Sequence, residues 1–233
     1  MGRVARVVVP GYPHHVTQRG VRSMRIFRHD GDKRMYLRFL AEEKERFGTE
    51  ILAWCLMSNH VHLVAVPREE RALARTVGDA HKKYTWMRNF REGTRGYLFQ
   101  GRFHSCVLDE RHLLAAVRYV ECNPVRAGVA KNAWEYPWSS ARFHLRRRKR
   151  DILVHDRNLY GLIDNWEEYL SGEDSEAERK LRAATRTGRP AGDKGIVALV
   201  RQLTGRDLTK QKPGPHARNM GRKSALELSD VSP

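Results

Sequence analysis

The chain has 233 residues and a net charge of +17, from 44 Lys and Arg against 27 Asp and Glu. Hydrophobic residues make up 40% of it, so the composition excludes a disordered chain and allows one core-forming domain of ordinary size. The excess of positive charge favours a polyanionic partner, above all a nucleic acid.

The hydrophobic pattern of the first 145 residues predicts alternating strands and helices. Their ranges, in chain order, are a strand at His15–Gln18, a helix at 31–47, strands at Glu50–Met57 and His60–Val66, a helix at 70–90, a strand at Phe103–Leu108 and a helix at 110–122. Gly48 should end the first helix, and Asp109 should cap the last, which stops at Asn123 because Pro124 follows. The order β-α-β-β-α-β-α contains the ferredoxin-like split pattern, so we predict an α+β fold with an antiparallel sheet.

The charge distribution divides the chain in two. Residues 1–150 hold 30 of the basic and 14 of the acidic residues, while the rest of the chain is nearly balanced. We therefore predict a main domain over 1–145, followed over 146–233 by a basic linker and a C-terminal helical, partly flexible extension. Helical patterns are found at 165–183 and 194–204, the second closed by Gly205, whereas 211–233 looks loose.

Several other classes of protein are excluded by what the sequence lacks. Three cysteines without Cys-x-x-Cys spacing rule out a disulfide framework and fit a reducing, cytoplasmic compartment. No apolar run is long enough to span a bilayer, and the apolar stretch near the N-terminus is too short for a signal peptide. No P-loop or dinucleotide-binding motif is found, so we expect neither a membrane nor a nucleotide cofactor as a partner.

Two histidines stand two residues apart in the predicted strand His60–Val66. Side chains at this spacing point to the same face of a strand, so His60 and His62 could form half of a metal site. The alternative is that they are ordinary hydrogen-bonded histidines beside the core, and taken alone this alternative is favoured.

Tyr119 and Asn123 stand four apart in the last predicted helix, which places them on one face, one turn apart. Tyr119 lies at the margin of the apolar stripe, so its hydroxyl could reach a cleft. The alternative is that Tyr119 packs at the edge of the core and that Asn123 only ends the helix.

Taken together, these features resemble the REP-associated tyrosine transposases, a branch of the single-tyrosine HUH transposases. The segments that carry the resemblance occur in the family's order and are His15–Gly20, Trp54–Leu63, Leu98–Phe103, Arg118–Gly128 and Trp138–Ala141. The chain departs from the pattern at Ser58, where the family usually has Pro, and at Val21, where it usually has Asn. Neither departure falls on a proposed catalytic residue.

The resemblance implies a metal-dependent transposase or nickase that cleaves and rejoins single-stranded DNA near hairpin sites. Tyr119 would attack a phosphodiester and form a 5′-phosphotyrosine intermediate, which keeps the bond energy for rejoining. His60, His62 and Asn123 would hold a divalent ion, Mg²⁺ or Mn²⁺. The resemblance also implies a monomer rather than a dimer, acting on hairpin DNA in the cytoplasm, in association with the nucleoid.

DNA binding should use basic and polar side chains near this site. The residues that we expect to bind DNA are Arg19, Arg22, Lys82, Lys83, Gln100 and Arg102. Aromatic residues near them could stack on bases, but we expect Tyr84, Trp86 and Phe103 in the core instead.

Other functions remain open from the residues. The chain could be a catalytically silent protein that binds hairpin DNA, or an RNA-binding protein, although it lacks the aromatic signature of RNA-recognition sheets. It could also be a metal-dependent hydrolase in which Tyr119 only orients water.

Overall fold

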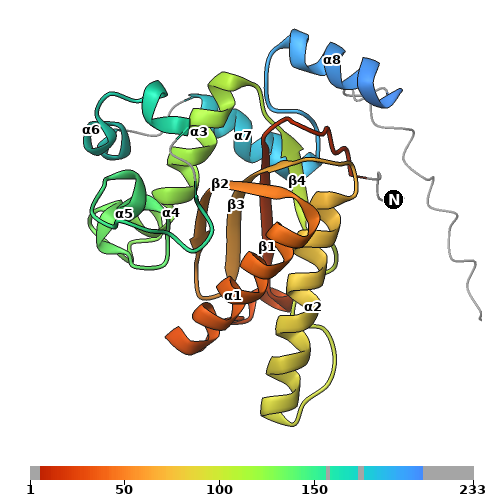
Figure 1. Ribbon diagram of the computed structural model, residues 1–233, viewed down its shortest axis with the longest axis vertical. Helices are drawn as coiled ribbons and strands as arrows, with labels where there is room; N and C mark the ends of the chain where they lie inside the picture. The colour runs from red at the N-terminus through yellow and green to blue at the C-terminus, as the bar shows by residue number, and fades with distance from the viewer. Residues whose placement is uncertain (1–5, 156–157, 173–175, 207–233) are drawn as a thin grey trace, which may run out of the picture.

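The computed structural model describes residues 6–155, 158–172 and 176–206, and its centre is a four-stranded antiparallel sheet (Figure 1). The strands lie in the order β2-β3-β1-β4. Their bounds are His14–Arg19 for β1, Thr49–Leu56 for β2, His60–Pro67 for β3 and His104–Val107 for β4. The order places β1 and β3 side by side in the middle, where both of their faces can be covered.

Helices fill the connections and cover both faces of the sheet. The α-helices are α1 (Asp30–Phe47), α2 (Ala72–Glu92), α3 (Glu110–Glu121), α4 (Asn123–Arg126), α5 (Ala141–His144), α6 (Trp166–Ser171), α7 (Glu176–Thr187) and α8 (Lys194–Thr204). Short 3₁₀ turns occur at Val21–Ser23, Ala133–Glu135 and Asn158–Leu162. In Figure 1, α1 and α2 run side by side across the sheet, while α7 and α8 lie near its upper end.

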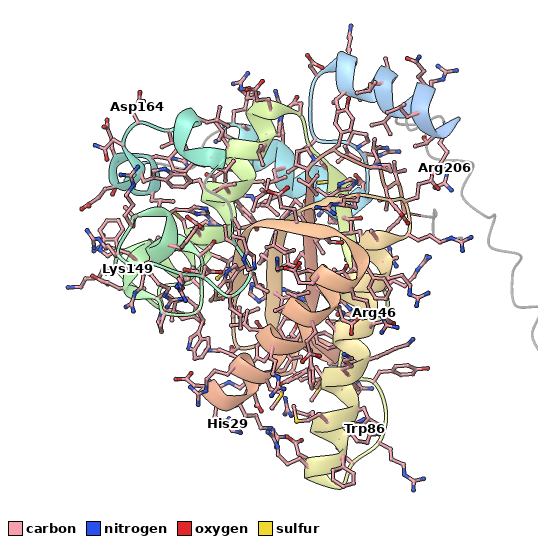
Figure 2. All side chains as sticks on the ribbon, in the orientation of Figure 1. His29, Arg46, Trp86, Lys149, Asp164 and Arg206 are labelled. Carbon is pink, nitrogen blue, oxygen red and sulfur yellow. The ribbon has the colours of Figure 1, made fainter. Side chains whose placement is uncertain are left out.

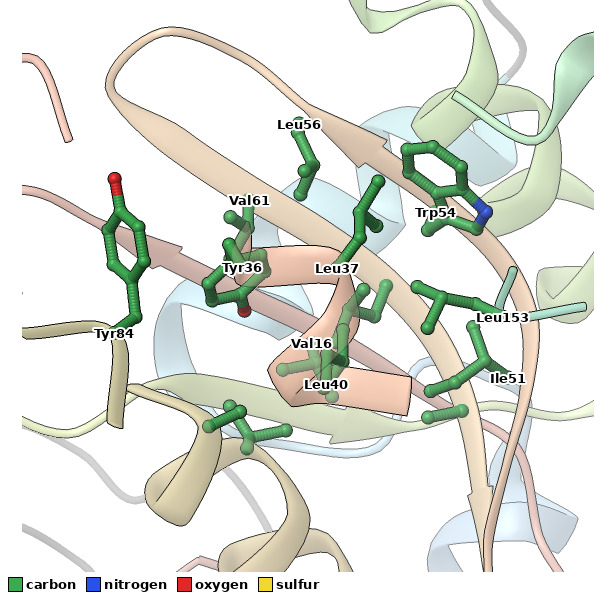
Figure 3. Packing of buried hydrophobic residues seen from close by; sticks show 14 of the residues in the cluster. Val16, Tyr36, Leu37, Leu40, Ile51, Trp54, Leu56, Val61, Tyr84 and Leu153 are labelled. Atoms are coloured by element: carbon green, nitrogen blue, oxygen red, sulfur yellow. The ribbon is translucent and has the colours of Figure 1, made fainter. Parts of the chain in front are cut away.

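The larger hydrophobic core lies between the sheet and the helices α1 and α2. Val16, Val61 and Leu63 project from β1 and β3 into this core, and Tyr36 and Tyr84 meet them from the two helices (Figure 3). All five side chains are almost completely buried. Burial of this apolar surface is the main favourable term that holds the helical layer on the sheet.

A second core covers the opposite face of the sheet. Val64 and Cys106 project from the sheet into it, and Val117 and Val120 meet them from α3. Because successive side chains of a strand alternate between faces, β3 sends Val61 and Leu63 to one core and His60, His62 and Val64 toward the other. The histidine pair therefore lies beneath α3.

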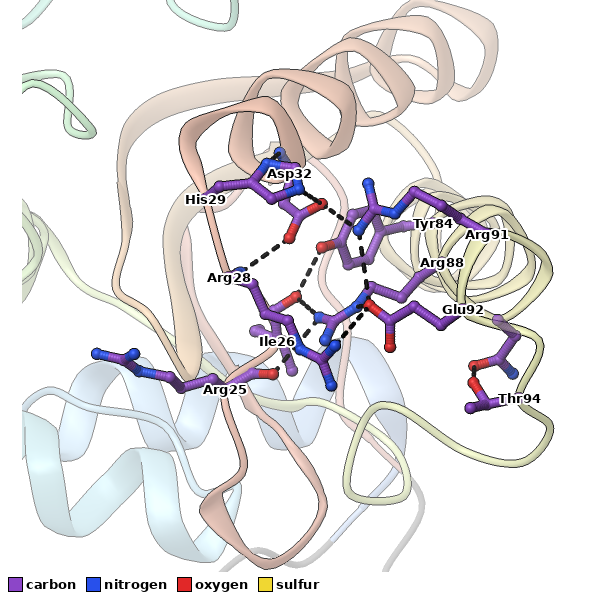
Figure 4. A network of polar contacts seen from close by, with 11 residues as sticks. Arg25, Ile26, Arg28, His29, Asp32, Tyr84, Arg88, Arg91, Glu92 and Thr94 are labelled. Carbon is purple, nitrogen blue, oxygen red and sulfur yellow. Dashed lines mark hydrogen bonds and ion pairs between the residues drawn. The ribbon is translucent and has the colours of Figure 1, made fainter.

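Polar contacts fix the start of α1 against the end of α2 (Figure 4). Asp32 is buried and accepts hydrogen bonds from the Arg28 backbone, at 2.8 Å, and from the Arg91 guanidinium, at 2.7 Å. Burial opposes ionisation of this carboxyl group, but the two hydrogen bonds hold its pKa below the usual value. Arg88 and the Tyr84 hydroxyl both donate to the Ile26 carbonyl. This network makes the helical layer a fixed support for the strands.

The predicted element order and the α+β, ferredoxin-like fold class are confirmed. Gly48 ends α1 in the left-handed conformation with φ of 61°, and Asp109 caps α3 by accepting from the His112 backbone. Helix α3 stops at Glu121, and a separate short helix begins at Asn123 with Pro124 in its first turn.

One predicted helix is wrong as a single element. The pattern over 165–183 predicted one helix, but α6 ends at Ser171 and the next described helix begins at Glu176. Gly172 is extended there, and a Cβ added to it would lie 2.6 Å from a terminal nitrogen of Arg118. Gly172, a residue of low helix propensity, therefore lies where the helix ends and leaves room for the Arg118 side chain.

The C-terminal part of the chain packs onto the main domain. Helix α7 contacts α3, β1 and β4, and Leu181 of α7 is buried in the second core. Helix α8 begins at an Asp193 cap and ends at Gly205, as predicted. The residues predicted to be loose, 211–233, lie outside the described residues. No helix in the described part of the chain is long and apolar enough to cross a membrane.

A buried histidine in the larger core makes stability depend on pH. His81 of α2 stacks on Phe99 with ring centroids 3.9 Å apart, and its Nε2 atom is hydrogen-bonded to the Tyr36 hydroxyl. Burial, with a smaller effect of Arg6, lowers its pKa to about 3. Between pH 6.5 and 3 the unfolded state therefore binds more protons at this residue, so its contribution to stability is lost as the pH falls.

We expect His81→Gln, which cannot titrate, to flatten the pH dependence of stability. The slope of the unfolding free energy between pH 6 and 4 should fall by about 1.4 kcal/mol per pH unit. Urea unfolding at a series of pH values measures the slope. At pH 7.5 the histidine is largely neutral in both states, so a difference in stability there reports the packing cost of the substitution. Parallel curves for the variant and the wild type would contradict this account.

Candidate active site

A cavity of about 710 Å³ opens between the sheet and helices α3 and α7. It lies on the face of the sheet that carries the histidine pair. Its lining residues are His15, Thr17, Gln18, Arg19, His60, His62, Gln100, His104, Tyr119, Asn123, Arg182, Ala183, Thr185 and Arg186. None of these described lining residues is acidic, so the cavity is suited to an anionic ligand.

His60 presents its Nε2 atom to Asn123. Its Nδ1 atom lies 2.6 Å from the Asn59 side-chain oxygen, and the Asn59 amide nitrogen donates to the Ser23 carbonyl, which fixes that oxygen as the acceptor. In the neutral ring, Nδ1 therefore donates and Nε2 keeps a lone pair. This Nε2 atom lies 3.3 Å from the Asn123 side-chain oxygen. An imidazole nitrogen and the Asn123 side chain thus meet at one point of the cavity, where both could contact a bound cation.

His62 is oriented by a chain of hydrogen bonds that begins on α7. The Thr185 hydroxyl donates to the Leu181 carbonyl, so it accepts from His15 Nδ1, 2.7 Å away. His15 Nε2 then accepts from His62 Nδ1 at 3.0 Å. This assignment leaves the lone pair of neutral His62 on Nε2, as in His60. Both histidines of the pair thus present the same ring nitrogen as an acceptor.

Burial keeps the three imidazoles neutral. It lowers the pKa of His15 to about 3, with a smaller effect of Arg126. It also lowers the pKa of His62 well below the usual value, an effect strengthened by its two histidine neighbours. For His60, burial again lowers the pKa, although the contact with Asn123 opposes the shift. Neutral imidazole is the form that ligates metal ions.

Tyr119 projects from α3 toward the histidines and is half-buried. Its ring lies edge-on to those of His15 and His62, with centroids 5.6 Å away in each case. The Arg126 guanidinium stacks over the ring at 4.0 Å and donates to the Tyr119 carbonyl. The tyrosine is thus held between imidazole rings and a cation, and it faces the same cavity.

Arg126, the cation beside Tyr119, forms an ion pair with Glu178 of α7. Glu178 is only 1% exposed, lies 2.6 Å from Arg118 Nε and forms an ion pair with Arg126 at 3.6 Å. A buried carboxylate on the C-terminal helix thus joins α7 to the helix that carries the tyrosine and to the arginine stacked on it.

The structure brings together six of the residues predicted from the sequence. Tyr119, His60, His62 and Asn123 line one cavity with Arg19 and Gln100, and the Gln100 backbone donates to the Arg19 carbonyl. Within the described residues, no group of three His, Cys, Asp or Glu side chains could hold a metal ion. A third protein ligand would therefore have to be a different donor, such as the Asn123 amide oxygen.

Four other residues predicted to bind DNA do not line this cavity. Arg22 and Arg102 are exposed outside it. Lys82 and Lys83 lie on α2, over the opposite face of the sheet. Lys82 pairs with Asp79, and Lys83 pairs with Glu42 and Glu43.

The placement of one aromatic residue differs from the prediction. Tyr84 and Phe103 are buried, as predicted, but Trp86 is 70% exposed near the end of α2 (Figure 2). It stacks on Phe90, which is 79% exposed. The prediction was wrong because Trp86 falls outside the stripe Val77, Ala80 and Tyr84 that α2 turns toward the sheet.

Sequence reasoning missed several residues of the cavity. His15 has the same strand parity as Thr17 and could have been placed on this face by alternation. Thr185, Arg182 and Arg186 come from α7, and nothing in their local sequence shows that α7 packs beside β1. Their place in the site depends on tertiary packing.

The fold and the cavity together define an α+β domain with a cavity lined by histidines and a tyrosine. The chain is similar to a solved structure of a REP-associated tyrosine transposase bound to a REP hairpin, with a TM-score of 0.54 and 19% sequence identity. The match covers 67% of this chain and 92% of that one, and at this identity it shows a shared fold. The family model described as "Transposase IS200 like" matches residues 9–123, just under half of the chain, and the predicted resemblance is confirmed. A search of curated proteins found no match.

We expect Glu178→Ala to lower the unfolding free energy by about 3 kcal/mol, because it removes the buried partner of Arg118 and Arg126. Urea unfolding measures the change. The matched control is Glu176→Ala on the same helix, whose pair with Lys180 is exposed and should contribute little. Equal effects of the two substitutions would show that Glu178 does not join α7 to α3.

Proposed function

We propose that the protein is a single-tyrosine transposase that nicks and rejoins single-stranded DNA. The observation that carries the proposal is the placement of Tyr119 beside His60, His62 and Asn123 in one cavity without acidic lining residues. A phenol, two neutral imidazoles and an amide oxygen in a cationic cavity form a set suited to attack on a phosphodiester. These residues come from β3, α3 and the first position of α4, and all four lie within the segment that the family model matches.

In the proposed reaction the Tyr119 hydroxyl oxygen attacks the phosphorus of a DNA phosphodiester. A bond forms between the phenolic oxygen and phosphorus, and the bond from phosphorus to the 3′-oxygen breaks. The phenolic proton is lost and the departing 3′-oxygen gains one, so the products are a 5′-phosphotyrosine and a free 3′-hydroxyl. The reverse reaction rejoins a strand without a nucleotide cofactor. Arg126, stacked on the tyrosine ring, limits the orientations that the ring can adopt.

The donor set of the cavity fits a divalent metal ion. His60 Nε2, His62 Nε2 and the Asn123 side-chain oxygen are the atoms that would hold it, and imidazole with oxygen donors suits Mn²⁺, or Mg²⁺ with more waters. When bound, such an ion polarises the scissile phosphate and neutralises developing charge. His15 and Thr185 keep the proton of His62 on Nδ1, away from the metal side.

The proposed substrate is hairpin DNA with a single-stranded flank. Support comes from the excess positive charge of the chain and from the structural similarity to a transposase that was solved with a REP hairpin. We further propose that the chain belongs to the REP-associated branch and acts as a monomer in the cytoplasm, where it meets chromosomal repeats. The order of the motifs along this chain agrees with that branch.

The first test is the formation of a covalent protein–DNA adduct. Wild type with Mn²⁺ should give a slowly migrating, denaturant-resistant band with labelled hairpin DNA from repeats that flank the gene. Tyr119→Phe lacks the attacking oxygen and should give no band, while its DNA affinity stays within about threefold because the cavity is otherwise intact.

Two outcomes of this assay would overturn the proposal. Tight binding without an adduct at any metal concentration would leave a silent hairpin-binding protein. Cleavage that persists in Tyr119→Phe would assign the attack to a water molecule instead.

The second test measures the metal site directly. We expect Thr185→Val, which removes the acceptor that orients His15, to weaken Mn²⁺ binding by roughly 10- to 100-fold, as losses of such supporting contacts typically do. Thr185→Ser keeps the hydroxyl and serves as the matched control. Binding is measured by calorimetry without DNA, so the result does not depend on activity. Equal Mn²⁺ affinity in the two variants would show that the hydrogen bonds from Thr185 through His15 do not orient His62 for metal binding.

A further inference from the structure

Helix α7 forms one wall of the cavity, although it lies outside the segment that matches the family model. The family match ends at residue 123, and α7 spans Glu176–Thr187. Of the cavity residues on α7, Arg182 and Arg186 are the charged ones, and both are exposed. They stand four residues apart, so they lie on one side of the helix, one turn from each other.

This helix is held by a buried stripe that lies next to its arginines. Glu178 pairs with Arg118 and Arg126, Leu181 is buried in the second core, and Thr185 contacts His15. These three contacts fix the rotation of α7 about its axis. The buried stripe therefore determines that Arg182 and Arg186 face the cavity.

The two arginines lie beside the attacking tyrosine and across from another cation. The Arg182 guanidinium carbon lies 5.9 Å from the centroid of the Tyr119 ring. Arg19, at the end of β1, lines the cavity from the sheet. A phosphate that reaches Tyr119 must enter this space. No described residue that lines the cavity is acidic, so the charged side chains of its described lining favour a phosphate.

We propose that α7 is the binding wall for the single-stranded part of the substrate, in which Arg182 and Arg186 bind backbone phosphates that flank the scissile bond. The proposal rests on the proposed function for the choice of DNA as ligand. Arginine is suited to this task because its planar fork can donate two hydrogen bonds to one phosphate. The contacts carry no base information, so they hold the strand in place whatever its sequence. The hairpin itself would be bound elsewhere.

The test compares two DNA probes in a Tyr119→Phe background, where no covalent product forms. One probe is a hairpin from the repeats that flank the gene, with single-stranded extensions on both sides of its foot. The other is the same hairpin without extensions. Fluorescence anisotropy gives the Kd of each probe over a series of salt concentrations.

We expect Arg182→Ala and Arg186→Ala each to weaken binding of the extended probe roughly tenfold at low salt. Each should also reduce the slope of log K against log salt by about 0.7, because one contact to a single-stranded phosphate is lost. The double variant should lose about 1.4 in slope. Binding of the hairpin without extensions should not change.

Lys180→Ala is the matched control. It removes the same charge from the same helix, but Lys180 lies on the side away from the cavity and pairs with Glu176. Arg182→Lys and Arg186→Lys keep the positive charge, so each should retain most of the wild-type slope of log K against log salt. A melting temperature within about 2 °C of the parent shows that the fold is intact.

Three results would overturn the proposal. The first is an unchanged Kd and slope in the double variant. The second is an equal loss of affinity for both probes, which would show that the arginines bind the hairpin duplex. The third is an equal loss in Lys180→Ala, which would make the effect one of net charge alone.

Failure of this proposal is distinguishable from failure of the proposed function. If wild type forms the adduct but the arginine variants bind the extended probe normally, the transposase reaction is supported and phosphate binding by α7 is rejected. If wild type forms no adduct while the arginine variants bind the extended probe more weakly, phosphate binding by α7 is supported and the cleavage step is rejected.

Discussion

The site depends on the alternation of side chains along β3, in a sheet whose two faces are both covered. Val61 and Leu63 are fixed by the larger core beneath α1 and α2, so the residues between and beside them must turn the other way. His60 and His62 are therefore presented to α3 by the same packing that stabilises the domain. A shift of β3 by one residue would place two imidazoles in an apolar core and two apolar side chains in the cavity. The hydrophobic effect thus enforces the register on which the chemistry depends.

The opposite wall of the site is built by contacts across long sequence distances. Tyr119 reaches the histidines only because α3 packs on the sheet, and its neighbour Arg126 is held by Glu178 of α7. Thr185, on the same helix, orients His15 and through it His62. One helix near the C-terminal end of the described chain thus supports both the tyrosine and the histidine pair. Loosening α7 would affect Tyr119 and the proposed metal ligands together.

The sequence was sufficient for the parts of the fold that depend on local pattern. Strand alternation located β3 and its histidines, and helical spacing located Tyr119 and Asn123, because these periodicities are properties of each element alone. It was insufficient where another element decides the outcome. The helix predicted over 165–183 is interrupted where Gly172 meets Arg118, and Trp86 is exposed although its size favours burial. Arg182 and Arg186 could not be assigned to the cavity, because only the packing of α7 places them there.

The charge of the molecule is organised by where its carboxylates lie. On the helical layer over the opposite face, basic residues are paired with acidic ones, as Lys83 is with Glu43 and Arg91 is with Asp32. These cations contribute to the net charge but are already neutralised locally, which weakens their attraction for a polyanion. The cavity has cations from β1 and α7 and, among its described lining residues, no carboxylate. A count of lysines and arginines along the sequence therefore does not separate the two faces of the sheet, whereas the distribution of acidic groups distinguishes the cavity beside Tyr119.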